Sequence, residues 1–259
     1  MLQYDFMRNA LSAGFLIALL CPVIGAFLVL KRFSMMGDTL SHSAFAGVAL
    51  GYFVGLNPSL ASLIYTLVAA IFIEYLRNRF KSYEEVVMSI VMTFNVGLAI
   101  ILASRGTSGN ITAFLFGSIL TVEISDLVLI GLVTLISLIF IRVNYNKLLY
   151  ITFDEEGAEI SNIPVKTLNY LFMAVTGAAV GVSIRVTGLL VISSILVLPV
   201  AAALNLKQGF NKTLLSSVIF GLISVMSGLV LSYYIDSAPG GTIAIMSVAV
   251  LLGSFLIKR

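Results

Sequence analysis

Long apolar runs constrain this chain more than any other feature of its sequence. Residues 11–30, 188–206 and 214–235 each come close to the roughly 20 residues that a helix needs to cross a bilayer. Lipid offers no hydrogen-bond partner to the backbone, so only helices and closed barrels cross it. The runs do not alternate between polar and apolar residues as the strands of a membrane barrel do. The sequence therefore predicts an all-α, polytopic integral membrane protein.

Nine segments have the length and composition of a span. They are residues 11–30, 35–56, 59–76, 84–103, 123–141, 168–183, 188–206, 214–235 and 242–257. The count falls to eight if one of them only dips into the membrane. Residues 111–120 are too few to cross and suggest a re-entrant or interfacial piece. We expect Arg185 to separate two spans, and Glu74 to pair with the basic residues that follow it.

Charged residues make up 10% of the chain, against roughly 25% in soluble domains. We therefore expect residues 1–259 to form one membrane domain.

The basic residues predict the orientation of the chain. Positively charged residues collect on the cytoplasmic side of membrane proteins. One arrangement of the spans puts only Arg8, Arg105 and Arg185 outside. It places the C-terminus and residues 144–164 in the cytoplasm, and the N-terminus and the loop at Asp236 outside. The remaining basic residues lie inside: Lys31, Arg32, Arg77, Arg79, Lys81, Arg142, Lys147, Lys166, Lys207, Lys212, Lys258 and Arg259. The net charge of +3 therefore reflects membrane anchoring and does not indicate nucleic-acid binding.

The second predicted span carries the only histidine of the chain, His42, four residues after Asp38. On a helix, residues four apart lie on one face with Cβ atoms roughly 5–6 Å apart. A carboxylate and an imidazole at that spacing can share a divalent metal. They can also relay protons, or hold helices together as a hydrogen-bonded pair. Gly47, Gly51 and Gly55 form a ridge on the opposite side, which permits close packing against a neighbouring helix.

Asp236 is the other candidate ligand. It precedes Pro239-Gly240-Gly241, where an aspartate commonly forms a turn. It could instead be a third metal ligand or a gate residue at the outer mouth. Helical rise places Asp38 about 9–10 Å below the inner surface, whereas Asp236 lies near the outer one. A single site with Asp38, His42 and Asp236 therefore requires an unwound helix or a dipping loop, and otherwise Asp236 belongs to a separate gate.

Three stretches resemble the permease subunits of the bacterial zinc/manganese/iron(II) ABC transporter family. Residues 32–43, which contain Gly37-Asp38 and Ser41-His42, closely resemble a characteristic segment of that family. Residues 188–203 look like its long glycine-to-proline span, and residues 153–165 look like its cytoplasmic coupling segment. The family usually has glycine at the position of Asn162, and asparagine also tolerates left-handed turns.

The resemblance implies the fold of a type II ABC importer permease in the plasma membrane of a prokaryote. It implies a homodimer, a separate cytoplasmic ATPase subunit and an extracellular metal-binding solute-binding protein. Asp38 and His42 match the metal-pathway pair of the family, and Asp236 resembles a second acidic position. The cargo would be zinc or manganese, with iron(II) also compatible, and we expect no permanently bound cofactor. The ATPase would dock on the coupling segment, about residues 144–165, which includes Asp154, Glu155, Glu156, Ala158, Ile163 and Pro164.

Three functions compete on these residues. An ABC permease requires a partner ATPase, since the chain contains no G-x-x-x-x-G-K-[ST] phosphate loop and no set of catalytic residues. A secondary transporter would use Asp38 and His42 as a proton relay. A scaffold would need neither residue. The polar stretch at 144–164 favours the permease, because a secondary transporter needs no docking segment there.

Overall fold

The computed structural model describes residues 4–80, 83–105, 111–118 and 122–257, which contain twelve helices and no strand. Their bounds are α1 Asp5–Leu30, α2 Met36–Val54, α3 Pro58–Arg79, α4 Glu84–Ser104, α5 Ile111–Phe116, α6 Ile124–Val143, α7 Tyr145–Phe153, α8 Glu155–Ile160, α9 Val165–Thr187, α10 Leu189–Asn205, α11 Phe210–Ile235 and α12 Pro239–Ile257.

The helices match the nine predicted spans. Seven are long and apolar enough to cross a membrane, namely α1, α3, α4, α6, α9, α11 and α12. The other two are α2, whose first half is polar, and α10, which has 17 residues. The short segment near residue 111 is α5, with six residues. The acidic stretch after Asp154 forms α8, as expected, and α7 precedes it.

The prediction that Arg185 separates two spans is wrong. Arg185 lies in the last turn of α9, which continues to Thr187. The chain turns at Gly188, whose φ of +79° is costly for a residue with a side chain. The Arg185 guanidinium binds Asp126 at 2.6 Å, and Asp126 also accepts a hydrogen bond from Ser59 at 2.8 Å. Because its charge is paired, Arg185 can lie within the last turn of α9, although the sequence alone suggests that the helix ends before it.

Helix α3 is packed between α2 and α9 by glycines on both sides. A Cβ on Gly47 of α2 would lie 2.9 Å from the Cα of Ser62, and Gly51 is equally close to α3. On the other side, Gly177 and Gly181 of α9 approach α3 as closely. The predicted ridge is thus confirmed for Gly47 and Gly51, but not for Gly55. Gly55 is the left-handed C-cap that follows α2, and a Cβ there would meet nothing within 4 Å.

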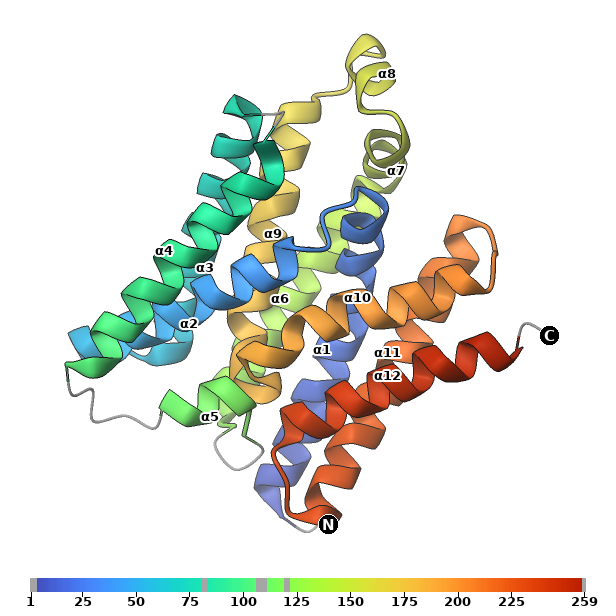
Figure 1. Cartoon of the computed structure of the whole chain (residues 1–259). Coiled ribbons are helices and arrows are strands. Elements are labelled where there is room, and N and C mark those ends of the chain that lie inside the picture. Colours follow the sequence, from blue (N-terminus) through green and yellow to red (C-terminus); the bar gives the residue numbers. More distant parts are fainter. Residues whose placement is uncertain (1–3, 81–82, 106–110, 119–121, 258–259) are drawn as a thin grey trace.

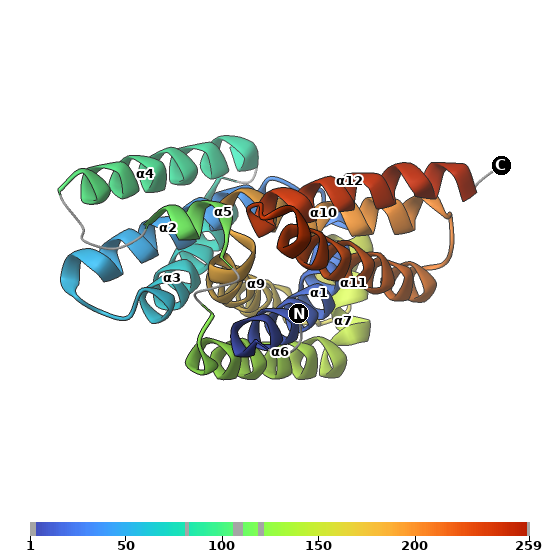
Figure 2. The ribbon, with the colours of Figure 1, turned by 90° about the horizontal axis from the view of Figure 1, so that it is seen from below.

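Helix α1 is the centre of the other half of the molecule. It packs against α6, α9, α10 and α11, and the two ribbon views show it enclosed among them (Figures 1 and 2). Gly25 allows the closest contact, because a Cβ there would overlap the carbonyl oxygen of Leu196 on α10. The side chains of Ile17, Ile24 and Phe27 are almost fully buried in this core.

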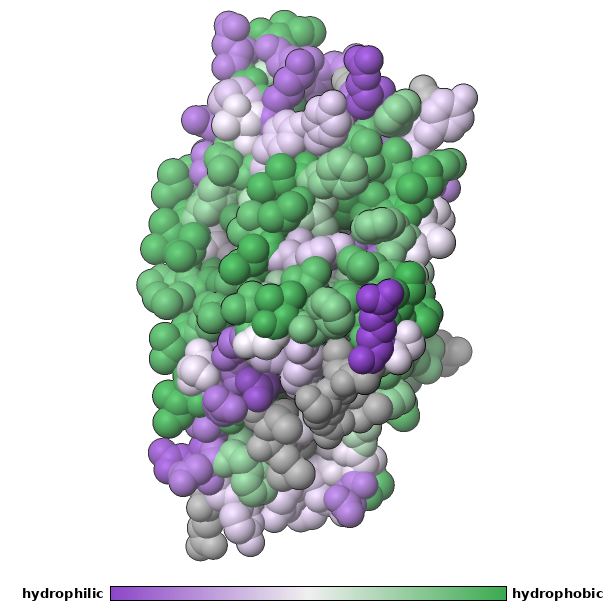
Figure 3. Space-filling view, turned by 90° about the vertical axis from the view of Figure 1, so that its left-hand side faces the viewer, coloured by the Kyte–Doolittle hydropathy of each residue, from purple (hydrophilic) through white to green (hydrophobic). Residues whose placement is uncertain are grey.

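The molecule has an apolar middle and two polar ends. Figure 3 shows a broad hydrophobic band, with hydrophilic residues gathered above it. Large apolar side chains of the membrane-length helices are exposed, among them Ile64 of α3 at 63% and Leu135 of α6 at 58%, as expected for contact with lipid. Near the C-terminal end of α3, Glu74 is fully buried and binds Arg77 at 2.8 Å, and Arg77 lines a hollow together with Glu155 of α8. This confirms the predicted pairing of Glu74 with a basic neighbour.

We predict that Gly47→Ala destabilises the protein. The new methyl group would lie 2.8 Å from the Cβ of Tyr65 and 2.9 Å from the Cα of Ser62, so the two helices must separate. Overpacking of this kind costs about 1–3 kcal/mol, which lowers Tm by several degrees. The Tm of the variant is measured by thermal unfolding of the detergent-solubilised chain. Gly253→Ala is the matched control, because nothing lies within 4 Å of its new Cβ. Equal Tm values for the two variants would contradict the close packing.

Candidate functional site

Asp38 and His42 lie on an open face of α2. Asp38 is exposed in the first turn of the helix, and His42 is half-buried one turn later. Asp38 lines a hollow of about 300 Å³, together with Ser193 and Ser194 of α10. The rest of the lining is Ser34, Met35, Val197 and Leu198. We call the surface formed by Asp38, His42, Ser193 and Ser194 the α2–α10 face.

The α2–α10 face lies between two flanking helices. Helix α2 packs against α10 and α4, and α10 packs against α12. Seen from below, α4 lies beside α2 and α12 lies beside α10 along the same edge of the molecule, with α5 between them (Figure 2). The face therefore belongs to a broad surface of the chain and is not buried within one helical bundle.

The other polar residues in the first half of α2 have structural roles. The hydroxyls of Thr39, Ser41 and Ser43 donate to the carbonyl oxygen four residues earlier, at 3.1, 2.7 and 2.9 Å. All three side chains are buried. In contrast, Asp38 and His42 form no hydrogen bond or salt bridge to any described residue. The interpretation of Asp38 and His42 as a hydrogen-bonded pair that holds helices together is therefore not supported.

A buried polar network, which the sequence did not reveal, holds α2 in place. The side-chain amide of Asn95 on α4 donates to Ser43 Oγ at 2.8 Å. The Tyr65 hydroxyl on α3 donates to Asn95 Oδ1 at 2.7 Å. An asparagine inside an apolar span is a signal for such a network, because its amide needs partners in lipid.

Asp236 is the C-cap of α11, with a left-handed backbone at φ 55° and an exposed side chain. Its backbone N–H donates to the carbonyl of Ser232. Within the described ranges, no three Asp, Glu, His or Cys side chains are grouped so as to hold a metal. A single chain therefore does not bring Asp236 together with Asp38 and His42.

The predicted coupling residues form a compact structure around α8. Asp154 caps the helix and accepts a hydrogen bond from the Gly157 N–H at 2.8 Å. Ala158 is buried in a small apolar cluster, against which Ile163 packs. Asn162 has a φ of 57°, the left-handed conformation expected there, and Pro164 is the N-cap of α9. Glu155 and Glu156 are exposed.

A second polar network links α8 to the connection between α1 and α2. Lys31, which follows α1, donates to Asn169 Oδ1 at 2.8 Å, and Asn169 donates to Glu155 at 3.2 Å. Burial lowers the pKa of the Lys31 ammonium to about 8, and the Arg77 charge acts in the same direction. Arg77 in turn lies over the ring of Phe33, 4.3 Å from its centroid. The segment that leads to Asp38 is thus linked, through Asn169 of α9, to the helix that carries Glu155.

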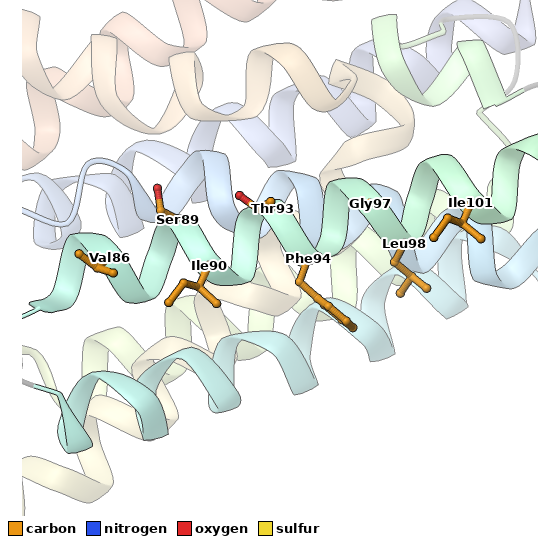
Figure 4. A pocket seen from close by; sticks show the side chains of 8 residues that line it. All are labelled: Val86, Ser89, Ile90, Thr93, Phe94, Gly97, Leu98 and Ile101. Atoms are coloured by element: carbon orange, nitrogen blue, oxygen red, sulfur yellow. The ribbon is translucent and has the colours of Figure 1, made fainter.

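A further hollow of about 560 Å³ runs along α4 and holds no titratable group. Figure 4 shows Ser89 and Thr93 on one edge, with Ile90, Phe94 and Leu98 on the other. Such a lining suits the packing of a helix better than the binding of an ion.

Comparisons with known proteins show the family of the chain. The family model described as the ABC 3 transport family matches residues 3–258. The probable metal transport system membrane protein of Treponema pallidum (strain Nichols) is 43% identical over 253 residues, which cover 97% of this chain and 95% of that protein. The manganese transport system membrane protein MntC of Halalkalibacterium halodurans is 30% identical, with 95% and 85% covered. The high-affinity zinc uptake system membrane protein ZnuB of Haemophilus influenzae is 29% identical, with 99% of each chain covered.

Solved structures show the same fold. The structure titled PsaBC from Streptococcus pneumoniae in complex with Fab superposes with a TM-score of 0.86 and 28% identity, covering 98% of this chain and 92% of that one. A family match over nearly the whole length and a relative at 43% identity lead to one conclusion: the chain belongs to the ABC 3 transport family.

Proposed function

We propose that this chain is the membrane permease of an ABC importer for a divalent transition metal, with Asp38 and His42 on the ion pathway. The observation that carries the proposal is the pair itself, an exposed Asp38 and a half-buried His42 without hydrogen-bond partners among the described residues. A carboxylate within a membrane helix costs on the order of 2.5–3.5 kcal/mol unless a partner or a function compensates for it. Asp38 has no hydrogen-bond partner among the described residues, so a passing cation supplies the missing interaction.

The ligand types suit the cargo of the relatives. Imidazole nitrogen and carboxylate oxygen bind Zn²⁺, and Mn²⁺ and Fe²⁺ accept the same ligands. Zinc or manganese is therefore the proposed substrate, and no permanently bound cofactor is needed. Two ligands from one chain hold an ion weakly, which is compatible with release during transport.

A second copy of the chain would complete the site. Two α2–α10 faces related by a twofold axis bring two aspartates and two histidines together, the four ligands typical of a closed zinc site. Helix α4 supports this homodimer. Ser89, Thr93 and Gly97 form a stripe of small residues on its exposed side, and a Cβ on Gly97 would meet nothing within 4 Å (Figure 4). The comparable stripes of small residues on α2 and α9 pack against α3, whereas the stripe on α4 has no such neighbour within the described chain.

The α7–α8 segment is the proposed docking site of the ATPase subunit. Its exposed groups include Glu155, Glu156 and Ile160, which is 83% exposed. A partner with an apolar pocket and basic side chains would fit this surface. A movement of α8 would be transmitted to the segment before Asp38 through the hydrogen bonds of Asn169 with Glu155 and Lys31. The segment and the C-terminus then lie in the cytoplasm of a prokaryote, in a single permease domain of its plasma membrane.

The opposite end of the molecule would receive the ion from an extracellular metal-binding protein. Asp236 lies at that end, apart from Asp38 and His42, and is proposed to act as a separate gate. The alternative function, a proton-coupled transporter, gives no role to the docking surface on α8.

We predict that metal uptake depends on ATP and on Asp38. Vesicles that contain the permease, its ATPase and the metal-loaded binding protein should accumulate ⁶⁵Zn²⁺ or ⁵⁴Mn²⁺ only with ATP. Asp38→Ala should reduce the uptake rate at least tenfold, because the ion loses a charged ligand that two copies would each supply. Asp5→Ala is the matched control, since its carboxylate is 93% exposed at the start of α1. Uptake by the permease alone under a pH gradient would establish the secondary transporter instead.

We also predict that Thr93 lies near its counterpart in the homodimer. The only native cysteine, Cys21, is buried, so Thr93→Cys adds a single reactive thiol. A bismaleimide applied to membranes should link two copies through this position. Leu135→Cys on α6, 58% exposed, should remain monomeric because α6 faces lipid. Crosslinking through position 135 and not through position 93 would place the dimer interface elsewhere.

A further inference from the structure

A long apolar groove runs between α6 and α11, both of which pack on α1. Its volume is about 800 Å³. Leu19 and Val23 of α1 contribute to its lining, with Leu138 of α6 on one side and Leu214 and Val218 of α11 on the other. The neighbouring side chains on the outer surface of α6 are apolar and exposed, so the groove opens toward lipid.

One end of the groove is polar. Arg142 lies there in the last turn of α6, exposed, and it is the only charged residue in the lining. It forms no ion pair within the described part of the chain. Beside it, the Tyr145 hydroxyl donates to the side-chain oxygen of Asn211, which joins α7 to α11 across this end of the groove. The groove thus combines an apolar length with an uncompensated positive charge at its end.

This end lies at the α7 side of the molecule, because α7 follows α6 directly. In the orientation proposed above, that is the cytoplasmic leaflet, which is rich in anionic lipids. Figure 2 shows α6 on the side of the molecule opposite α4. The groove therefore stays in contact with lipid when two copies associate through the α4 side.

We propose that the α6–α11 groove is a binding site for an anionic phospholipid. One acyl chain lies along Leu19, Leu138 and Val218, and the phosphate binds the guanidinium of Arg142. A basic pocket between membrane helices on the cytoplasmic side is the ordinary setting for such headgroup recognition. Charge complementarity selects an anionic lipid over a zwitterionic one, and the bound lipid would hold α6 and α11 together on α1.

The test is lipid retention by the full chain. The permease is reconstituted in phosphatidylcholine vesicles with a minor fraction of phosphatidylglycerol, then extracted, and its bound lipids are counted by native mass spectrometry. We expect phosphatidylglycerol to be enriched over its share in the vesicle. Arg142→Gln should reduce this enrichment roughly fivefold, the effect of one basic residue at a charged membrane surface. Lys147→Gln is the matched control, because Lys147 is an exposed cation of α7 outside the groove.

Three outcomes would overturn the proposal. Retention of both lipids in proportion to their supply would show that the groove does not select a headgroup. Equal losses in Arg142→Gln and Lys147→Gln would show a general surface-charge effect. Stabilisation of the protein by inorganic phosphate alone, to the same Tm as with phosphatidylglycerol, would show an anion site without an acyl chain.

A second variant tests the groove independently of the charge. Val218→Phe adds bulk to its wall, since Val218 is half-buried in the lining. It should lower the retention of phosphatidylglycerol while Arg142 is intact. Full retention in this variant would contradict an acyl chain lying in the groove.

Discussion

Lipid provides no hydrogen-bond partner, and most of this structure follows from that constraint. Buried charges are paired, as in Glu74 with Arg77 and Asp126 with Arg185. Many buried hydroxyls donate to carbonyls of their own helices, as Ser41 does, and Asn95 is held by Ser43 and Tyr65. Asp38 and His42 differ from these residues, because neither forms a hydrogen bond or a salt bridge to any described residue. This lack of partners is the reason for proposing Asp38 and His42 as the site.

The position of the site depends on how α2 is fixed. Its glycines seat it on α3, which turns Asp38 and His42 away from the chain's own core. The Asn95 network fixes it to α4, and contacts through Lys31, Asn169 and Glu155 reach α8 from the segment before α2. The proposed metal-binding pair therefore lies on a helix whose beginning is linked to the proposed ATPase docking surface. A transporter driven by ATP needs such a physical connection between the two.

The sequence predicted the helices well, since span length, glycine and proline positions and capping residues are local signals. The face shared by Asp38 and His42 followed from helical periodicity, and the ridge with Gly47 did so too. The error at Arg185 has a tertiary cause, because Asp126 is 59 residues away in the chain. The Asn95 network and the groove at Arg142 depend on how each helix is rotated, which no local pattern specifies. Whether Asp236 lies in the same site as Asp38 and His42 also depends on tertiary structure.

The central claim is that Asp38 lies on the metal pathway, and cellular metal content tests it most directly. Zinc, manganese and iron are measured in cells that lack their own copy of the permease and carry either the native chain or Asp38→Ala, at equal amounts in the membrane. Our account predicts that one metal falls in the variant to the level of cells with no permease. Native levels of every metal in the variant, with low levels in cells lacking the permease, would show that Asp38 has only a structural role.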